Sequence, residues 1–404
     1  MAERIEVIGV GPDGRLATEL PGDVSLVAGG ARHLERFAPP GVATCVIGGD
    51  LDQVAGALDA AVGTAVVLAS GDPGWFGIVR RLGRDLGADR LRVHPAPSSV
   101  AGAFAAIGLP WEDATVVSAH GRAPGAAIAA ALVAPKVAVL TAPDRSPAWL
   151  AHTLLAAGCG PRTVVVASRL GHDDAVVQRT DLAGAVDLEV ADPNVVLVLD
   201  EARLARIGAA TVRGHGPVGL PWARDADAFE HRDGQVSKPE VRALALARLG
   251  AGPGRLLWDV GCGSGSVAVE AAGLGAGVIA VDRDADQVAR TRANADRFGV
   301  GVGVVHGPAP AVLADLPDPD AVFVGGGGPD LAAVLDLVLA RTRDRVVVAL
   351  ATLERAGPVL ARFDAAGWDA GGELVQVQDL RPLADGHRLV PRNPVLLICG
   401  GRRP

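Results

Sequence analysis

Two glycine-rich loops constrain the fold of this chain most strongly, because each one directly follows a short apolar strand pattern. The first loop, Gly9-Val10-Gly11-Pro12, ends the apolar run that begins at Ile5. The second loop, Gly261-Cys262-Gly263-Ser264-Gly265, follows the run 256–260. Glycines between a strand and a helix let the backbone approach a ligand closely, which is typical of α/β domains. The two loops therefore predict two separate α/β domains.

Length and charge agree with this interpretation. A chain of 404 residues with 49% hydrophobic side chains can build two cores of roughly 200 residues each. The net charge of −8 argues against a general nucleic-acid binder, which needs a basic face. The most apolar stretch, 123–135, is shorter than the roughly 20 residues that span a bilayer. We therefore expect a cytoplasmic protein with neither a signal peptide nor a membrane segment.

The four cysteines, Cys45, Cys159, Cys262 and Cys399, lie far apart in the sequence and include no C-x-x-C pair. This pattern predicts reduced thiols, with no zinc site and no disulfide framework.

Short β-branched runs alternate with alanine-rich helical stretches in both halves, which predicts mostly parallel sheets with crossover helices. In the first half the expected strands are 5–9, 24–28, 65–69, 91–94, 115–118, 137–141, 163–168 and 195–199. The expected helices there are 31–37, 75–86, 99–107 and 147–157. Charged residues, Gly and Pro between 201 and 221 predict a domain boundary: residues 1–203 form the first domain, 204–216 a linker and 217–404 the second domain.

The second loop carries two acidic residues at informative positions. Asp259 lies two residues before the loop, and Asp282 ends the next apolar strand, where it can accept hydrogen bonds from two ribose hydroxyls. The third glycine comes one residue earlier than in the dinucleotide pattern G-x-G-x-x-G. Negative charge at Asp259 would repel a pyrophosphate but suit the sulfonium or ammonium group of S-adenosylmethionine. A nicotinamide site and a purely structural turn remain alternatives.

Gly325 and Gly326 end a later strand of the same half. In an open α/β sheet this strand is expected beside the first one, at the edge where ligands bind. We therefore expect the reacting substrate there.

The first loop matches G-x-G-x-x-G letter for letter over residues 9–14, yet the next strand ends in Gly29-Gly30 without an acid for a ribose. We therefore interpret this loop as something other than a dinucleotide site. Three further stretches, 70–77, 95–99 and 118–122, are expected at the carboxyl edge of a parallel sheet, although each alone could be an ordinary turn.

Taken together, these residues resemble two enzyme families. The first half resembles the tetrapyrrole methylases through Gly9–Pro12, 27–34, Gly-Asp-Pro-Gly-Trp-Phe-Gly at 71–77, 97–100 and 118–122. The second half resembles the decarboxylating precorrin methyltransferases through 229–234, 237–242, 259–265 and 393–395. The order of the motifs is similar to that of the fused precorrin-6Y C5,15-methyltransferase (decarboxylating) family of cobalamin biosynthesis.

This resemblance implies an α/β fold with two parts. A tetrapyrrole methylase fold, made of two α/β subdomains with a cleft, would precede a Rossmann-like class I methyltransferase domain. The implied activity is methylation of precorrin-6B at C5 and C15 with decarboxylation of the C12 acetate, giving precorrin-8X. It implies one S-adenosylmethionine per domain, no metal and a tetrapyrrole substrate. We expect a homo-oligomer that uses neither nucleic acid nor membrane as a partner.

The resemblance also implies roles for individual residues. Expected to bind the cofactor are Gly71, Asp72, Pro73, Ser98, Ser99, His120, Gly121, Asp259, Gly261, Gly263, Gly265 and Asp282. Expected to border the substrate are Gly9, Gly11, Pro12, Arg122, Gly325 and Gly326. Candidates for reprotonation after decarboxylation are Glu230, His231 and Asp233, and candidate carboxylate clamps are Arg32, Arg122, Arg232 and Lys238. Pro308 departs from the family pattern, so adenine would be recognised there by backbone groups.

Three other functions fit parts of the pattern. They are a methyltransferase for RNA or protein, a nicotinamide-dependent oxidoreductase, and a tetrapyrrole carrier without catalysis. The acidic balance weighs against RNA, and the glycine spacing weighs against a nicotinamide.

Overall fold

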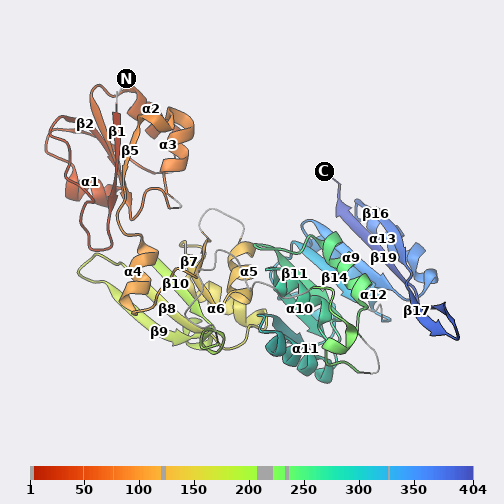
Figure 1. Cartoon of the computed structure of the whole chain (residues 1–404). Helices are drawn as coiled ribbons and strands as arrows, with labels where there is room; N and C mark the ends of the chain where they lie inside the picture. The colour runs from red at the N-terminus through yellow and green to blue at the C-terminus, as the bar shows by residue number, and fades with distance from the viewer. Residues whose placement is uncertain are drawn as a thin grey trace. The chain divides into compact units, whose positions relative to one another are not determined.

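The structure, a computed structural model, describes residues 4–48, 50–75, 77–119, 124–206, 222–232, 236–325 and 328–403. The chain divides into two compact units, and each is mixed α/β as expected. The first unit comprises residues 1–111, 165–179 and 190–196, and the second comprises 112–164, 180–189 and 197–404. Figure 1 shows the order of the elements along the chain, from red to blue.

The first unit contains a parallel sheet with strand order β3-β2-β4-β1-β5. Its strands are β1 (Arg4–Val10), β2 (Val24–Gly29), β3 (Ala43–Val46), β4 (Thr64–Ser70) and β5 (Leu91–His94). Its helices are α1 (Ala31–Phe37), α2 (Leu51–Ala60) and α3 (Val79–Leu86). Both faces of the sheet are covered, because Val7 packs in a cluster with α2 and α3 whereas Ile8 packs with Leu34 of α1.

The middle of the chain supplies a second five-stranded sheet with order β6-β7-β10-β8-β9. Its strands are β6 (Thr115–Ser118), β7 (Lys136–Leu140), β8 (Thr163–Ser168), β9 (Val176–Asp181) and β10 (Asn194–Leu199). The helices of this part are α4 (Ser99–Ala106), α5 (Gly125–Val133), α6 (Pro147–Ala156), α7 (Leu182–Ala185) and α8 (Glu201–Leu204).

The last part of the chain, within the second unit, forms a seven-stranded sheet with order β13-β12-β11-β14-β15-β19-β16. The strands are β11 (Leu256–Val260), β12 (Gly277–Asp282), β13 (Gly303–His306), β14 (Ala321–Gly325), β15 (Arg345–Leu350), β16 (Trp368–Val375) and β19 (Val395–Arg402). The helices are α9 (Pro239–Leu249), α10 (Ser266–Gly273), α11 (Ala285–Phe298), α12 (Leu331–Arg341) and α13 (Ala356–Ala365). The strands from β11 to β15 are parallel, and β19 is antiparallel to both neighbours.

The strand order of this sheet positions its ligand edge. From β11 the chain first builds β12 and β13 on one side and then returns to place β14 on the other side. The carboxyl ends of β11 and β14 therefore lie side by side, as expected from the sequence, and residues 257–260 pair with 321–324. Such a switch point is where open α/β sheets bind ligands.

Helices α5 and α6 also pack against this sheet within the second unit. A Cβ atom built on Gly277 of β12 would overlap the backbone of Ala129 in α5, so only glycine permits this approach. The backbone N–H of Val304 in β13 donates to the carbonyl of Gly158, which follows α6, at 3.1 Å. Every helix within the described ranges is too short or too polar to cross a membrane.

Some elements differ from the sequence prediction. The helix expected from Trp75 begins at Val79, because residues 72–75 form turns in which Asp72 accepts from the backbone N–H of Gly74 at 2.8 Å. The hairpin β17 (Gln378–Leu383) and β18 (Gly386–Pro391) was not predicted, and neither was β9. These strands are mostly exposed and mix polar with apolar residues, so they lack the apolar run of a buried strand.

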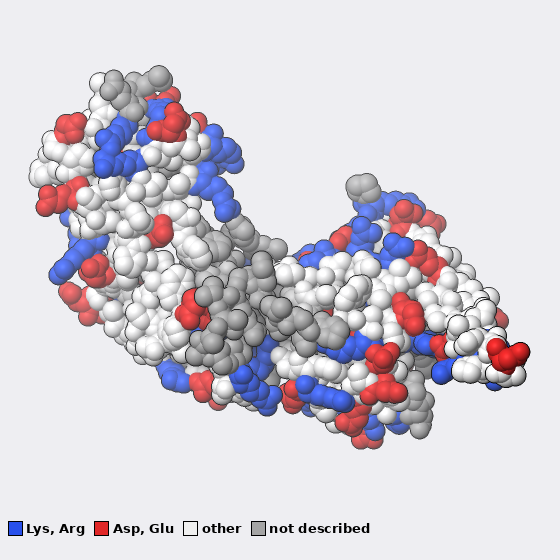
Figure 2. Space-filling model, viewed as in Figure 1, with Lys and Arg blue, Asp and Glu red and all other residues white. Residues whose placement is uncertain are grey.

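A buried ion pair joins α9 to α10, and its carboxylate also binds the segment that precedes α9. The Arg242 guanidinium of α9 lies 2.9 Å from the Glu270 carboxylate of α10, and both side chains are fully buried. The same carboxylate accepts from the backbone N–H groups of Ala223 and Arg224 at 3.0 and 2.9 Å. Figure 2 shows that exposed basic and acidic side chains are interspersed on the face it presents.

Arg242→Ala is expected to lower the free energy of unfolding of the second unit by ~3 kcal/mol, because the buried Glu270 carboxylate would lose its nearer guanidinium partner and keep only that of Arg224 at 4.0 Å. Denaturant unfolding of the full chain measures this. Arg248→Ala is the matched control on the same helix, since its pair with Glu373 leaves the two side chains 48% and 40% exposed. Equal losses in both variants would contradict the assignment.

Candidate functional site

A cavity of about 740 Å³ opens at the carboxyl edge of the seven-stranded sheet. It is lined by the loop that follows β11 and by the ends of β12 and β14. Of the predicted site residues, Asp259, Gly261, Gly263, Asp282 and Gly325 line it. The structure therefore brings together the second glycine-rich loop, the predicted ribose acid and the predicted substrate edge.

Glycine at position 261 is a steric requirement of this edge. Its φ of 73° lies in the left-handed region, and a Cβ atom there would overlap the carbonyl oxygen of Gly325. Conversely, a Cβ atom on Gly325 would lie 2.9 Å from the carbonyl oxygen of Gly261. The two strand ends thus approach each other through bare backbone, and the space above them stays open.

The Asp259 carboxyl group is buried beneath the loop, and one of its two oxygen atoms has no hydrogen-bond partner. Its Oδ2 atom accepts from the backbone N–H of Ala268 in α10 at 3.0 Å, whereas its Oδ1 atom has no partner. Burial raises the pKa of this carboxyl to about 7. The sequence prediction of a fully charged group beside the loop is thereby refined, because the group titrates near neutral pH.

The Asp282 carboxylate organises the loop from the neighbouring strand. Its Oδ2 atom accepts from the backbone N–H of Gly263 at 2.9 Å, and its Oδ1 atom accepts from that of Asp284 at 2.9 Å. An ionised carboxylate offers about four acceptor positions, so two remain for hydroxyl donors. Gly265 is the N-cap of α10, which directs the helix N-terminus toward the same edge.

Asn294 of α11 is a positioning residue that sequence reasoning missed. Its side chain is buried, and its amide nitrogen donates to the carbonyls of Ser264 and Glu230, each at 2.9 Å. Its amide oxygen accepts from the backbone N–H of Glu230 at 2.8 Å. It therefore ties the segment before α9 to the glycine-rich loop, and no local pattern marks it.

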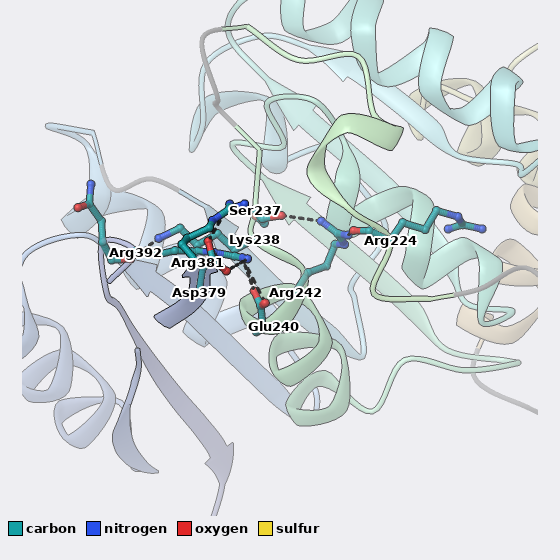
Figure 3. Close-up of polar contacts among 9 residues, drawn as sticks. Arg224, Ser237, Lys238, Glu240, Arg242, Asp379, Arg381 and Arg392 are labelled. Carbon is teal, nitrogen blue, oxygen red and sulfur yellow. Dashed lines mark hydrogen bonds and ion pairs between the residues drawn. The ribbon is translucent and has the colours of Figure 1, made fainter. Parts of the chain in front are cut away.

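Arg242 and its neighbours position the start of α9 beside the cavity (Figure 3). Arg242 donates to the backbone carbonyls of Ser237 and Arg224, and Lys238 donates to the carbonyl of Asn393. Ser237 and Lys238 both line the cavity. The loop that contains Asn393 is held in turn by Arg392, which donates to the carboxylates of Asp379 at the base of the hairpin and Glu240 of α9.

Only some of the other site residues predicted for the second half line this cavity. Arg232 lines the cavity and donates to Asp284 at 2.9 Å, whereas neither Glu230 nor His231 is among the lining residues. Asp233 and Gly326 lie outside the described residues. The stretch 307–309, which includes Pro308, lines the cavity.

The first unit repeats the close approach of strand ends. A Cβ atom on Gly9 would overlap the carbonyl oxygen of Gly71 and lie 2.7 Å from the backbone nitrogen of Ala96. The backbone N–H of Gly71 donates to the carbonyl of Val10 at 2.7 Å. The Gly9–Pro12 loop and the Gly71–Pro73 stretch are therefore direct neighbours at the ends of β1 and β4.

The third predicted stretch joins them from α4. A Cβ atom on Gly71 would lie 3.1 Å from Cα of Ser98, whose hydroxyl caps α4 by accepting from the N–H of Ala101 at 3.1 Å. A cavity of about 190 Å³ lies here, lined in part by Gly11, Pro12, Gly71 and Ser99. His120, Gly121 and Arg122 lie outside the described residues.

No group of three His, Cys, Asp or Glu side chains within the described ranges is arranged to hold a metal ion. All four cysteines are free thiols, and burial raises the pKa of Cys262 beside the loop well above its usual range.

Both halves of the chain match known protein families. Residues 20–185 match the family of tetrapyrrole (corrin/porphyrin) methylases, and residues 227–399 match the precorrin methyltransferase domain. A precorrin-6Y C(5,15)-methyltransferase [decarboxylating] from Sinorhizobium sp. is 35% identical over 355 residues, covering 81% of this chain and 79% of the relative. The chain belongs to the precorrin-6Y C5,15-methyltransferase (decarboxylating) family.

Two shorter relatives each match about half of the chain. A cobalt-precorrin-7 C(5)-methyltransferase from Salmonella typhimurium is 31% identical and covers 49% of this chain and 99% of its own length. A Pyrobaculum calidifontis protein named "probable cobalt-precorrin-6B C(15)-methyltransferase (decarboxylating)" is 40% identical and covers 45% of this chain and 96% of its own length. Membership of this family confirms the resemblance and disfavours the dehydrogenase, the carrier and the RNA or protein methyltransferase.

Asp259→Asn is expected to stabilise the ligand-free second unit at about pH 8. The folded pKa of about 7 lies above the usual value of 3.8, so folding favours the protonated form. The contribution of the Asp259 carboxyl to the free energy of unfolding of the wild type has its full value below about pH 4. It then falls by ~1.4 kcal/mol per pH unit as the pH rises toward 7. The variant has no such group to ionise.

Urea unfolding at about pH 5.5 and about pH 8 measures this effect. Relative to wild type, the free energy of unfolding of Asp259→Asn should be ~2 kcal/mol higher at about pH 8 than at about pH 5.5. The control is Asp286→Asn, at an exposed position of α11. Its free energy of unfolding relative to wild type should be the same at both pH values. An unchanged difference for Asp259→Asn would refute the raised pKa.

Proposed function

We propose that this protein methylates precorrin-6B at C5 and C15 and decarboxylates its C12 acetate side chain, giving precorrin-8X in cobalamin biosynthesis. The observation that carries the proposal is the pair of family matches on one chain, at 20–185 and 227–399. A relative named for the combined activity aligns with 81% of the chain. S-Adenosylmethionine serves as methyl donor in both halves.

The two halves divide the work. The tetrapyrrole methylase half methylates C5, as the single-activity relative named for that position suggests. The precorrin methyltransferase half methylates C15 and removes carbon dioxide, as the relative named for that pair of reactions suggests. Each half has its own cavity at a sheet edge, which supports a separate site in each.

The residues of the second cavity fit S-adenosylmethionine, which when bound supplies an electrophilic methyl group. The unpaired Oδ1 atom of buried Asp259 can accept from its ammonium group. The remaining acceptor positions of Asp282 suit the ribose hydroxyls. Gly261 keeps the space above the strand ends free of side-chain atoms, as a bound methionine moiety needs.

In the first unit, the backbone of Gly71 and the Ser99 side chain line the smaller cavity and are assigned to the methyl donor. Gly11 and Pro12 border the substrate. The Ser98 hydroxyl caps α4 as a hydrogen-bond acceptor, and its O–H can still donate a hydrogen bond to the methyl donor. Positioning of donor and acceptor atoms supplies most of the rate enhancement for such an in-line displacement.

Decarboxylation needs an electron sink and a proton. The conjugated macrocycle receives the electron pair when the bond to the carboxyl carbon breaks, and a proton then fills the vacated position. Arg232 and Lys238 line the second cavity and can bind substrate carboxylates. Glu230, His231 and Asp233, in the segment just before α9, remain the candidates for the proton donor.

The division of labour predicts two opposite defects. Asp282→Ala should abolish C15 methylation and decarboxylation but leave the first site intact, because the side chain lies in the second cavity. Ser99→Phe should abolish C5 methylation by filling the smaller cavity with a ring. Mass spectrometry of the tetrapyrrole distinguishes one added methyl group from two, and it reports the loss of carbon dioxide.

Mixing the two full-length variants should restore the doubly methylated, decarboxylated product, whichever reaction comes first. Asp286→Ala, at an exposed position of α11, is the control and should behave as wild type. If the Asp282→Ala variant still released carbon dioxide at the wild-type rate, the assignment of decarboxylation to this cavity would fail.

A further inference from the structure

The smaller cavity of the first unit has a basic wall, which includes Arg32, one of the carboxylate clamps expected from the sequence. Arg32 and Arg36 reach it from α1, and His172 reaches it from the loop after β8. None of the described residues that line this cavity is an Asp or a Glu. In a chain of net charge −8, a cavity lined by basic but not acidic side chains favours an anionic ligand.

The two arginines contact a hydroxyl and an aromatic ring. The Arg32 guanidinium donates to the neutral hydroxyl of Ser70 at 2.8 Å, and the Arg36 guanidinium lies 5.3 Å from the ring centre of Phe37. Among the described residues, neither arginine forms an ion pair with a carboxylate. Arg169, the other cation close to Arg32, is different because it pairs with Asp174 at 2.8 Å.

Burial and, to a smaller extent, the neighbouring positive charges lower the pKa of two groups at this cavity. Burial lowers the pKa of His33 to about 4, and the charge of Arg32 adds to this effect, as do those of His172 and Arg36. Burial also lowers the pKa of Arg32, with Arg169 contributing in the same direction. His33 is therefore neutral at physiological pH and lies 3.5 Å from the Ser70 hydroxyl through its Nε2 atom.

The size and place of the cavity restrict the anion. Its volume of about 190 Å³ is below the ~300–1,000 Å³ of pockets that enclose whole ligands, so it suits a single side chain of a larger molecule. Gly71 and Ser99 line the same cavity, so its occupant lies next to the expected methyl donor. Guanidinium groups bind carboxylates with a geometry that one ammonium cannot match.

We propose that Arg32, Arg36 and His172 form a carboxylate subsite that binds one acidic side chain of the tetrapyrrole during C5 methylation. The proposal rests on the function proposed above. The side chain belongs to one of the two rings that the C5 bridge joins, because only these lie close to the methyl acceptor. Arg32 and Arg36 thereby fix which bridging carbon faces the donor.

The test uses full-length Arg32→Gln and Arg36→Gln, singly and together, with Arg80→Gln as the matched control. Arg80 is an exposed arginine of α3 that does not line the cavity. Steady-state C5 methylation of precorrin-6B at saturating S-adenosylmethionine gives KM and kcat. Calorimetry with S-adenosylhomocysteine reports the donor site, and carbon dioxide release reports the second unit.

Each single variant should raise the KM for the tetrapyrrole by roughly 10- to 100-fold, as expected for the loss of a charged hydrogen bond. Affinity for S-adenosylhomocysteine and carbon dioxide release should stay at wild-type values. Arg32→Lys should recover only part of the loss, because an ammonium cannot bind in the bidentate mode. The KM of the wild type should also rise with salt more steeply than that of the double variant.

Two results would overturn the proposal. Weakened S-adenosylhomocysteine binding in the arginine variants would assign the subsite to the donor carboxylate instead of the substrate. An unchanged KM in the double variant would leave the basic wall without a role in binding. Failure of the proposed function itself would look different, because the wild-type protein would then add no methyl group at C5.

Discussion

The close approach of neighbouring strand ends, possible only where a side chain is missing, is the constraint on which both sites depend. Gly9 meets the carbonyl of Gly71 in the first unit, and Gly261 meets that of Gly325 in the second. In each case the glycine lies within one residue of the end of a central parallel strand, and the residue that it contacts lies equally close to the end of the adjacent strand. This shared geometry leaves space for a ligand above two different sheets.

Polar groups then complete each edge in different ways. In the second unit the buried Asp259 carboxyl keeps one oxygen unpaired, and its pKa of about 7 reflects the cost of charging it without a partner. A cationic ligand would supply that partner, so the raised pKa is consistent with a site prepared for a positive charge. In the first unit the uncompensated charges are arginines, which prepare that site for an anion.

The sequence brought the glycine-rich loop and two acidic residues of the second cavity together because their positions are set locally. Asp259, Gly261 and Asp282 stand at fixed positions on two consecutive strands, so spacing alone brings them together. In contrast, Asn294 and His172 reach their sites only through tertiary packing, and no neighbouring pattern marks them. The exposed hairpin β17–β18 was missed because its strands lack a buried apolar face.

Under the proposed function, one chain holds two independent methyl-donor sites of unrelated architecture. The most direct measurement is the binding stoichiometry of S-adenosylhomocysteine on the full-length protein, by calorimetry or equilibrium dialysis with an independently determined protein concentration. Two ligands per chain are expected. A stoichiometry of one, reached at saturation, would contradict this expectation.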